Sequence, residues 1–204
     1  MTDTMYFYDP QGPHGLAHDP FKAIIAPRVI AWVSSRSAAG QLNLAPYSFC
    51  GAFSNQPKLI GFSSDGCKDT VRNIEETGEF TWNMVSREML DAMNASSAPV
   101  ARGVDEFTLS GLRHAPGRSI ETPYVADTPV ALECRLVQII HLHDMDGQPT
   151  ANRLVLGQVV GVLIQPRCLR DGRFDLQAAQ PVMRAGYRGD YAALGEMFEL
   201  LRPA

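Results

Sequence analysis

The chain has 204 residues, of which 45% are hydrophobic and 20% charged, and its formal net charge at pH 7 is −4. These values are typical of one soluble domain with a sizeable core. The sequence contains no lysine- or arginine-rich run that could neutralise a nucleic-acid backbone, and no stretch approaching the ~20 apolar residues that span a bilayer. The first five residues lack the basic and apolar regions of a signal peptide. We therefore expect a cytoplasmic protein with no nucleic-acid or membrane partner.

The first half of the chain is typical of short strands. Residues 1–20 are rich in Pro, Gly, His and Asp and predict an extended arm, which a short helical turn at 21–26 follows. Three runs of β-branched and aromatic residues, bounded by Gly, Asn and Pro, then predict strands at 29–35, 45–54 and 59–63.

A short helix is predicted from Lys68 to Thr77, where apolar residues recur at helical spacing and Gly78 closes the last turn. Its N-terminus follows a segment rich in hydroxyl groups and glycine at 63–66. Unpaired backbone N–H groups and the helix dipole favour an anion at such a place. Lys68, Thr70 and Arg72 would add charge and a hydroxyl donor, so this segment indicates an anion site.

An ordinary capped helix would produce the same pattern. In that interpretation Ser64 or Asp69 caps the first turn and Lys68 is solvated. The segment alone leaves both interpretations open.

The second half continues with one more helix and two long strands. Residues 87–96 predict a helix whose Met89 and Met93 share an apolar face and are expected to fill the core. Two long β-type runs at 129–143 and 152–165 are joined by an Asp-Gly-containing segment, which indicates a hairpin. Residues 191–201 begin a helix-like pattern that Pro203 ends. We find no internal repeat or linker, so residues 1–204 are expected to form a single β-rich domain with peripheral helices.

The cysteines lie far apart and form no Cys-x-x-Cys pair, so we expect free thiols at Cys50, Cys67, Cys134 and Cys168. Cys67 adjoins Lys68 near the start of a helix, where a thiolate would be favoured. The alternative is a loop cysteine without chemistry.

Other catalytic and metal motifs are weak or missing. His141 and His143 would lie on the same face of a strand, which could suit a metal, but no third ligand is evident and a solvated strand end is the alternative. Ser48 has no evident histidine and acid partners, and the motif Gly-x-Ser-x-Gly is absent. The dinucleotide fingerprint Gly-x-Gly-x-x-Gly is also absent, so a nicotinamide cofactor would bind transiently.

The order of several short motifs gives the chain a family resemblance. A Pro-Arg pair at 27–28 precedes a Trp-Val-Ser strand at 32–34, a glycine turn near Gly40 and the sequence Asn-Leu-Ala-Pro-Tyr-Ser at 43–48. Lys-Asp-Thr at 68–70 and Asn-Ile at 73–74 follow, and segments 79–83, 105–107, 110–112, 132–134 and 157–160 continue the order. Over nearly its whole length the chain resembles the flavin reductase family. That resemblance implies a mainly β fold, an FMN-binding split β-barrel of the Greek-key type with peripheral helices.

The resemblance also implies a set of cofactor-binding residues. The flavin would be lined by residues of two segments, namely Ser34, Ser35, Asn43, Ala45, Pro46, Tyr47, Ser48 and Phe49. The ribityl phosphate would be held by Ser63, Ser64, Lys68, Asp69 and Thr70. Arg184 and Tyr191 belong to a tail pattern that is one residue longer here than in the family. Two interpretations are therefore open. Either Arg184 and Tyr191 lie near the flavin, or Arg184 is a loop arginine and Tyr191 is an aromatic residue at the start of a helix.

The function implied by the resemblance is an NAD(P)H-dependent flavin reductase. It would transfer a hydride from NADH or NADPH, the transient donor, to FMN, and could supply reduced flavin to a monooxygenase component. A homodimer is expected by analogy, with no metal site and no residue assigned as catalytic. The alternative is a non-catalytic or electron-transfer FMN protein similar to a flavoredoxin. A third reading, a fold that has lost its flavin site, conflicts with the intact segments 43–48 and 68–70.

Overall fold

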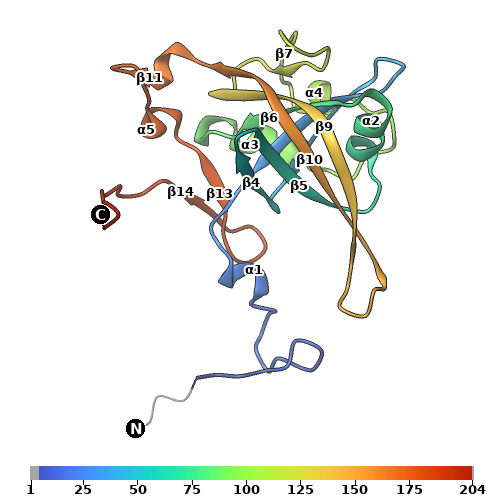
Figure 1. The fold of residues 1–204 in the computed structure, drawn as a ribbon, viewed down its shortest axis with the longest axis vertical. Helices are drawn as coiled ribbons and strands as arrows, with labels where there is room; N and C mark the ends of the chain where they lie inside the picture. Colours follow the sequence, from blue (N-terminus) through green and yellow to red (C-terminus); the bar gives the residue numbers. More distant parts are fainter. Residues whose placement is uncertain (1–4, 204) are drawn as a thin grey trace.

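The computed structural model describes residues 5–203 and consists mainly of antiparallel strands (Figure 1). Residues 1–4, where the predicted arm begins, and Ala204 lie outside the described residues. One sheet of seven strands dominates the molecule. In spatial order its strands are β3 (Leu42–Tyr47), β2 (Ala31–Arg36), β6 (Glu79–Met84), β9 (Val130–His143), β10 (Pro149–Ile164), β5 (Lys58–Asp65) and β4 (Cys50–Asn55).

The large sheet curls into a barrel because its two edge strands are consecutive in the sequence. Only Ser48 and Phe49 separate β3 from β4, although these strands stand at opposite ends of the spatial order. The amide of Ser63 in β5 donates to the carbonyl of Phe49 at 2.8 Å, which fixes this connection against the far side of the sheet. The predicted hairpin is the long β9–β10 pair, and it projects beyond the barrel in Figure 1.

Smaller sheets extend this body. The first joins both ends of the chain and consists of β1 (Arg28–Val29), β13 (Val182–Arg184) and β14 (Tyr191–Ala193). Two short hairpins pair β7 (His114–Ala115) with β8 (Tyr124–Val125), and β11 (Leu169–Arg170) with β12 (Arg173–Phe174).

Short helices lie around the barrel. They are α1 (Phe21–Ile24), α2 (Asp69–Thr77), α3 (Leu90–Ala95), α4 (Glu106–Leu109) and α5 (Leu176–Ala179), with single 3₁₀ turns η1 (Arg87–Met89) and η2 (Pro166–Cys168). The predicted helix at 68–77 is confirmed as α2, and Gly78 ends it in the left-handed conformation at φ 72°. That conformation has little cost only for a residue without a Cβ atom.

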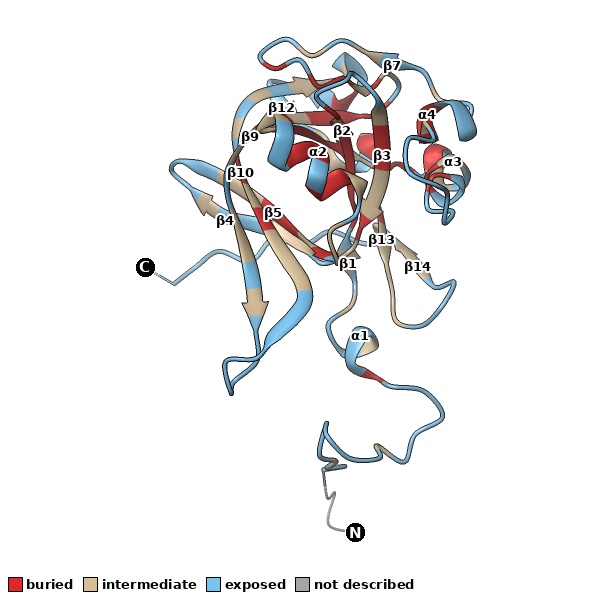
Figure 2. Cartoon of the chain, turned by 90° about the vertical axis from the view of Figure 1, so that its right-hand side faces the viewer, coloured by how far each residue is buried: buried red, intermediate tan, exposed pale blue. Residues whose placement is uncertain are grey.

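Two clusters of buried side chains hold the elements together, and each contains a residue of β3 (Figure 2). The first lies inside the barrel, where the ring of Phe62 contacts the rings of Tyr47 and Phe80 and α2 adds Val71 and Ile74. The second lies between β2, β3 and the helices and contains Trp32, Leu44, Met89, Met93 and Phe107. The predicted core role of Met89 and Met93 is therefore confirmed.

The predicted C-terminal helix is wrong. Residues 191–193 form β14, which pairs with β13, and residues 194–200 have no regular secondary structure. The helical pattern of this segment depended on its own spacing alone. Pairing with β13 satisfies the backbone of Tyr191–Ala193 instead, and Met197, Phe198 and Leu200 remain exposed.

Candidate functional site

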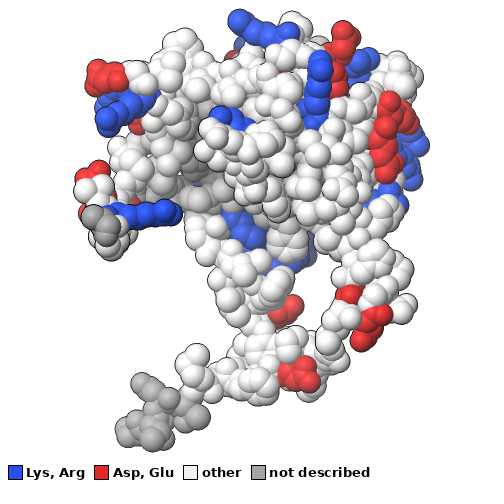
Figure 3. All heavy atoms as spheres, in the orientation of Figure 1, with Lys and Arg blue, Asp and Glu red and all other residues white. Residues whose placement is uncertain are grey.

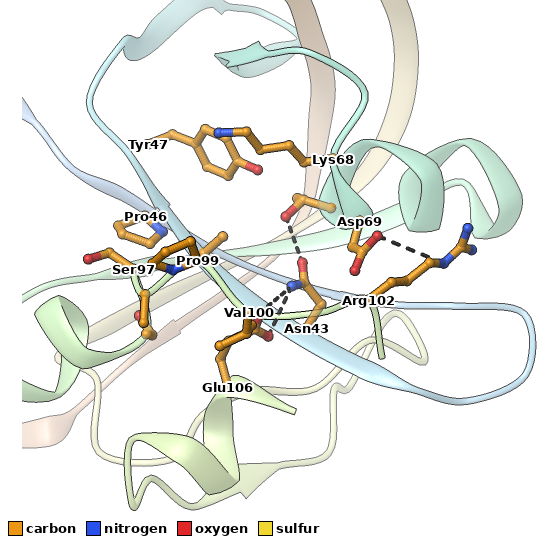
Figure 4. Close-up of a pocket in the computed structure, with 14 residues that line it drawn as sticks. Asn43, Pro46, Tyr47, Lys68, Asp69, Ser97, Pro99, Val100, Arg102 and Glu106 are labelled. Carbon is orange, nitrogen blue, oxygen red and sulfur yellow. Dashed lines mark hydrogen bonds and ion pairs between the residues drawn. The ribbon is translucent and has the colours of Figure 1, made fainter. Parts of the chain in front are cut away.

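A cavity of about 440 Å³ lies where β3 meets the N-terminus of α2 (Figure 4). We call it the Lys68 cavity. Its volume is within the range of roughly 300–1,000 Å³ typical of small-molecule sites. β3 contributes Asn43, Ala45, Pro46 and Tyr47, the start of α2 contributes Lys68, Asp69 and Thr70, and the segment 96–106 forms the third wall.

The side chain of Asn43 is fully engaged by its neighbours. Its amide nitrogen donates to both carboxylate oxygens of Glu106, at 3.0 and 2.9 Å, and its carbonyl oxygen accepts a 2.6 Å hydrogen bond from the Thr70 hydroxyl (Figure 4). Glu106 also accepts from the amide of Leu44 at 2.9 Å. These bonds tie β3, α2 and α4 together around the cavity, and they leave neither amide proton of Asn43 for a ligand.

Burial raises the pKa of Glu106, whereas its hydrogen bonds from Leu44 and Asn43 act in the opposite direction. All three hydrogen bonds require an acceptor, and a carboxylate is acceptor-only. These hydrogen bonds favour the ionised form, but burial is the larger effect and the pKa of Glu106 is raised.

The N-terminus of α2 has no side-chain cap among residues 5–203. Lys68 is the N-cap residue, and no side chain accepts from the first turn. The alternative in which Ser64 or Asp69 caps the helix is therefore wrong. The Ser64 hydroxyl donates to the carbonyl of Gly66, and the Asp69 carboxylate lies 3.7 Å from Arg72 and 3.8 Å from Arg102. The first backbone N–H groups of α2 remain available at the cavity.

Most of the charged side chains at this end of the cavity form ion pairs with one another. Asp69 is neutralised by two arginines, and Arg102 also reaches Glu76 at 3.7 Å. Lys68 is exposed and forms no ion pair with any residue that the structure describes. Its ammonium is thus the positive charge left to meet an anion.

Tyr47 places an unpartnered hydroxyl at the cavity. The residue is 8% exposed, and its hydroxyl makes no hydrogen bond of normal geometry, although Thr70 and Ser64 lie beside it. Those two hydroxyls donate to Asn43 and Gly66, so neither has a proton for Tyr47. Burial raises the pKa of Tyr47, which keeps the phenol neutral and able to donate.

A second cavity of about 440 Å³ adjoins the first. We call it the Arg188 cavity, and it shares Pro46, Tyr47 and Ser97 with the Lys68 cavity. Its other walls come from α3 and from the β13–β14 hairpin, which contributes Arg184, Arg188, Gly189 and Tyr191. The two cavities therefore meet along one common wall.

The extra residue of the C-terminal tail pattern falls in the turn of this hairpin. The turn spans 185–190 and is closed by a bond from the amide of Ala185 to the carbonyl of Asp190 at 3.1 Å. Arg184 and Tyr191 remain cross-strand partners, with the guanidinium 4.6 Å from the ring centre. The longer turn thus leaves the pairing of Arg184 with Tyr191 intact. The alternative, in which Arg184 lies in a loop and Tyr191 starts a helix, is wrong because both residues lie on strands.

Comparison with known proteins decides the family. The model of the flavin reductase like domain matches residues 25–174, which is most of the chain. The chain belongs to the flavin reductase-like family. The resemblance noted in the sequence is thereby confirmed.

The solved structures similar to this flavin reductase-like chain include the following three. Nitrilotriacetate monooxygenase component B from Bacillus cereus is 30% identical with a TM-score of 0.88, covering 98% of this chain and 100% of its own. Flavoredoxin of Desulfovibrio vulgaris is 25% identical with a TM-score of 0.77, covering 95% and 97%. A split barrel domain from Shewanella frigidimarina, 22% identical, has a TM-score of 0.79 and covers 90% of each chain. The predicted split β-barrel fold is confirmed.

The structure brings only part of the predicted flavin reductase-like site together. Asn43, Ala45, Pro46, Tyr47, Lys68, Asp69 and Thr70 line the Lys68 cavity, and Ser48, Arg184 and Tyr191 line the Arg188 cavity. Ser34, Ser35, Phe49, Ser63 and Ser64 line neither.

The serines of β2 are committed to the protein itself. The Ser34 hydroxyl donates to the carbonyl of Pro123 at 2.6 Å, and Ser35 bonds to Asn43 and Asn73. Both serines are fully buried. Their hydrogen bonds support the cavity wall, and binding roles for them stay predictions.

Sequence reasoning missed several residues of the site. Arg102 and Arg188 stand in loops with no local pattern, and the segment 96–100 follows α3 without a motif. Glu106 lies in a segment quoted for the resemblance, but its bond to Asn43 crosses 63 positions of sequence. Its place in the segment Asp105-Glu106-Phe107 was the sequence signal that could have drawn attention to it.

The remaining candidates lie outside the two cavities. His141 and His143 are exposed at the end of β9, and residues 5–203 bring no three His, Cys, Asp or Glu side chains together as metal ligands. All four cysteines are free, and the Cys67 thiol lies 3.9 Å from the carboxylate of Glu75. In the described part of the chain, no helix has the length and apolar character required to cross a membrane.

Proposed function

We propose that this flavin reductase-like protein binds FMN in the Lys68 cavity and catalyses its reduction by NADH or NADPH. The observation that carries the proposal is the uncapped N-terminus of α2, which opens into the cavity beside the unpaired Lys68 ammonium. Helix N–H groups and a point charge together suit a phosphate dianion. Thr70 would contribute its backbone amide, because its hydroxyl proton is bonded to Asn43. Asp69 would act by holding Arg102 at the rim.

The common wall of the two cavities suits the ring system of the cofactor. Pro46 and Tyr47 form this wall, and the neutral phenol of Tyr47 offers a donor that makes no hydrogen bond to any residue between 5 and 203. A buried hydroxyl without a partner is costly, so a polar ring edge that accepts from it would be stabilised. Ser48, Arg184 and Tyr191 would flank the same region from the second cavity.

Bound flavin would supply the two-electron chemistry, and the protein would position the reactants and exclude water. The side chains around the common wall therefore act by orientation, and none is assigned as an acid or base. The likeness to component B of a monooxygenase supports a partner that consumes reduced flavin. We further propose a cytoplasmic homodimer. Exposed valines on β9 and β10, namely Val137, Val160 and Val162, offer apolar surface for an interface.

A second candidate is an electron-carrying FMN protein, which the likeness to the Desulfovibrio vulgaris flavoredoxin favours. The same cavity would serve it. The two functions differ in how fast nicotinamide reduces the bound flavin.

Oxidation of NADH and NADPH by the purified protein, with and without added FMN under low oxygen, separates these functions. Rapid FMN-dependent oxidation is expected and would also identify the preferred donor. Bound yellow flavin with no oxidation would instead support the electron carrier. A purified protein that shows no flavin colour and oxidises no NADH or NADPH would refute both candidates.

Lys68→Ala tests the phosphate site directly. Loss of a charge-assisted bond should weaken FMN binding by roughly 1.5–3 kcal/mol, which is on the order of ten- to a hundredfold. Riboflavin lacks the phosphate, so its affinity should hardly change. Lys58→Ala is the matched control, because Lys58 is an exposed lysine on β5 that lines neither cavity. Equal FMN affinity of the Lys68 variant and the wild-type protein in a fluorescence titration would refute the assignment.

A further inference from the structure

Three side chains form a row across the sheet of β1, β13 and β14. Arg28 on β1 pairs in register with Arg184 on β13, and Arg184 pairs with Tyr191 on β14. Residues directly opposite in antiparallel strands point to the same face, and like charges at such positions repel. Burial, and then the charge of Arg184, lower the pKa of Arg28. The sheet thus maintains an electrostatically unfavourable arginine pair.

No acidic side chain compensates this charge among the described residues. Arg28, Arg184 and Arg188 form no ion pair there, although most of the other arginines do. The Arg188 cavity has two arginines in its walls and no Asp or Glu. Figure 3 shows basic atoms in the hollow between the barrel and the β13–β14 hairpin. This cavity differs from the Lys68 cavity, whose walls contain Asp69 and Glu106 as well as Lys68 and Arg102.

The guanidinium groups are oriented rather than free. Arg184 is held over the ring of Tyr191 at 4.6 Å, and Arg28 lies over the ring of Phe49 at 5.7 Å and donates to the carbonyl of Lys22. Aromatic contact fixes a guanidinium plane while leaving its N–H edge able to bind an anion. Arg188 reaches the same cavity from the turn.

We propose that Arg184 and Arg188 bind the pyrophosphate of the dinucleotide that donates the hydride. This inference rests on the proposed function, because it assumes FMN in the adjoining Lys68 cavity. A pyrophosphate in the Arg188 cavity would place the nicotinamide within reach of the wall formed by Pro46, Tyr47 and Ser97, which both cavities share.

A pyrophosphate matches this cavity better than a single carboxylate. Two forked guanidinium groups, with Arg28 beside Arg184 on the neighbouring strand, provide charge and paired donors for two phosphates. The sequence has no Gly-x-Gly-x-x-Gly turn, so a dinucleotide cannot use the helix N-terminus of a Rossmann unit. In this chain the charged side chains of Arg184 and Arg188 would take the place of that helix N-terminus.

Binding of ADP-ribose to the FMN-loaded protein, measured by calorimetry, tests the proposal without turnover. ADP-ribose carries the pyrophosphate but no nicotinamide. We expect the wild-type protein to bind it, and Arg188→Gln and Arg184→Gln each to weaken it about tenfold. Arg173→Gln is the matched control, because Arg173 is exposed on β12 and lines neither cavity. Undetectable binding by the wild-type protein, or an equal loss in all three variants, would overturn the proposal.

Steady-state kinetics provide the second readout. Arg188→Gln should raise KM for NADH or NADPH about tenfold more than KM for N-benzyl-1,4-dihydronicotinamide, which has no phosphate. Equal changes for both donors would overturn the proposal. So would a loss of FMN affinity without a loss of riboflavin affinity, because the arginines would then hold the FMN phosphate.

These results separate the inference from the proposed function. If the wild-type protein binds ADP-ribose through the two arginines but reduces no flavin, the reductase assignment fails and the pyrophosphate site stands. If N-benzyl-1,4-dihydronicotinamide reduces the flavin but ADP-ribose does not bind, the reductase stands and the pyrophosphate site falls.

Discussion

Replacing Glu106 by glutamine tests whether the network around Asn43 holds the cavity together. Both oxygens of Glu106 accept from the Asn43 amide, at 3.0 and 2.9 Å, and one also accepts from Leu44 at 2.9 Å. Glutamine presents one oxygen and one NH₂ group, so a donor of Asn43 would face another donor. Turning the Asn43 amide over would avoid this contact, but its NH₂ group would then face the hydroxyl of Thr70, which now donates to it at 2.6 Å.

The expected magnitude follows from these bonds. Losing one charge-assisted hydrogen bond at a 7% exposed carboxylate costs roughly 1.5–3 kcal/mol, and the neutral amide recovers part of this through easier burial. We therefore expect Glu106→Gln to lower the free energy of unfolding by about 2 kcal/mol at pH 7. For a chain of 204 residues this corresponds to a fall in Tm of about 4–8 °C.

The same variant should change how stability depends on pH. Burial raises the pKa of Glu106, so the folded protein retains a proton at pH values where the unfolded chain has lost it. The resulting stability is fully present below the unfolded pKa of about 4.3 and declines as pH rises towards the raised pKa of the folded state. The wild-type advantage over Glu106→Gln should therefore be smallest near neutral pH and grow as pH falls towards about 4.

Urea unfolding followed by circular dichroism measures both effects. Glu88→Gln is the control, because the Glu88 side chain is 75% exposed and its ion pair with Arg167 is long, at 3.9 Å. That variant should stay within about 0.5 kcal/mol of the wild-type protein. The reasoning is refuted if Glu106→Gln also stays within that range, or if the difference between variant and wild type shrinks as pH falls.

Two further substitutions separate binding from packing. Tyr47→Phe removes a hydroxyl without a partner, so we expect unfolding stability within about 0.5 kcal/mol of wild type and FMN affinity several-fold weaker by fluorescence titration; a large loss of stability with unchanged affinity would contradict this. Gly157→Ala would place a Cβ atom 2.4 Å from the Phe80 ring and should cost about 1–3 kcal/mol in urea unfolding. Gly195→Ala, where a Cβ atom meets nothing within 4 Å, should be nearly neutral, and equal effects at the two glycines would count against the packing argument.

Local pattern was sufficient where an element depends on its own sequence. The bounds of α2 and its end at Gly78 followed from apolar spacing and one glycine, and the β9–β10 hairpin followed from two long apolar runs around an Asp-Gly turn. The C-terminal segment failed for the converse reason. Its spacing is helical, but β13 offers Tyr191–Ala193 a strand partner, and such a partner lies outside any local window.

The site was predictable only in part, because its chemistry depends on distant contacts. Motif residues identified the cavity at Asn43 to Tyr47 and Lys68 to Thr70, but the roles of individual side chains depend on what else is nearby. Asn43 is bonded to Glu106 across 63 positions. Arg102 lies at the rim of the cavity through its ion pair with Asp69, and no spacing in the sequence indicates that pair.

The family motif and the binding groups are therefore largely different sets of atoms. Asn43 and Thr70 use their side chains on each other and on Glu106, so a ligand that bonded to them would have to replace an existing hydrogen bond. The free groups are the Lys68 ammonium, the first amides of α2 and the Tyr47 hydroxyl. If FMN binds as we propose, the motif holds the walls of its phosphate cavity in place, and Arg184 and Arg188 outside the motif select what binds beside the flavin. On this proposal, a related chain that kept the whole motif but changed the arginines of the β13–β14 hairpin would use a different electron donor.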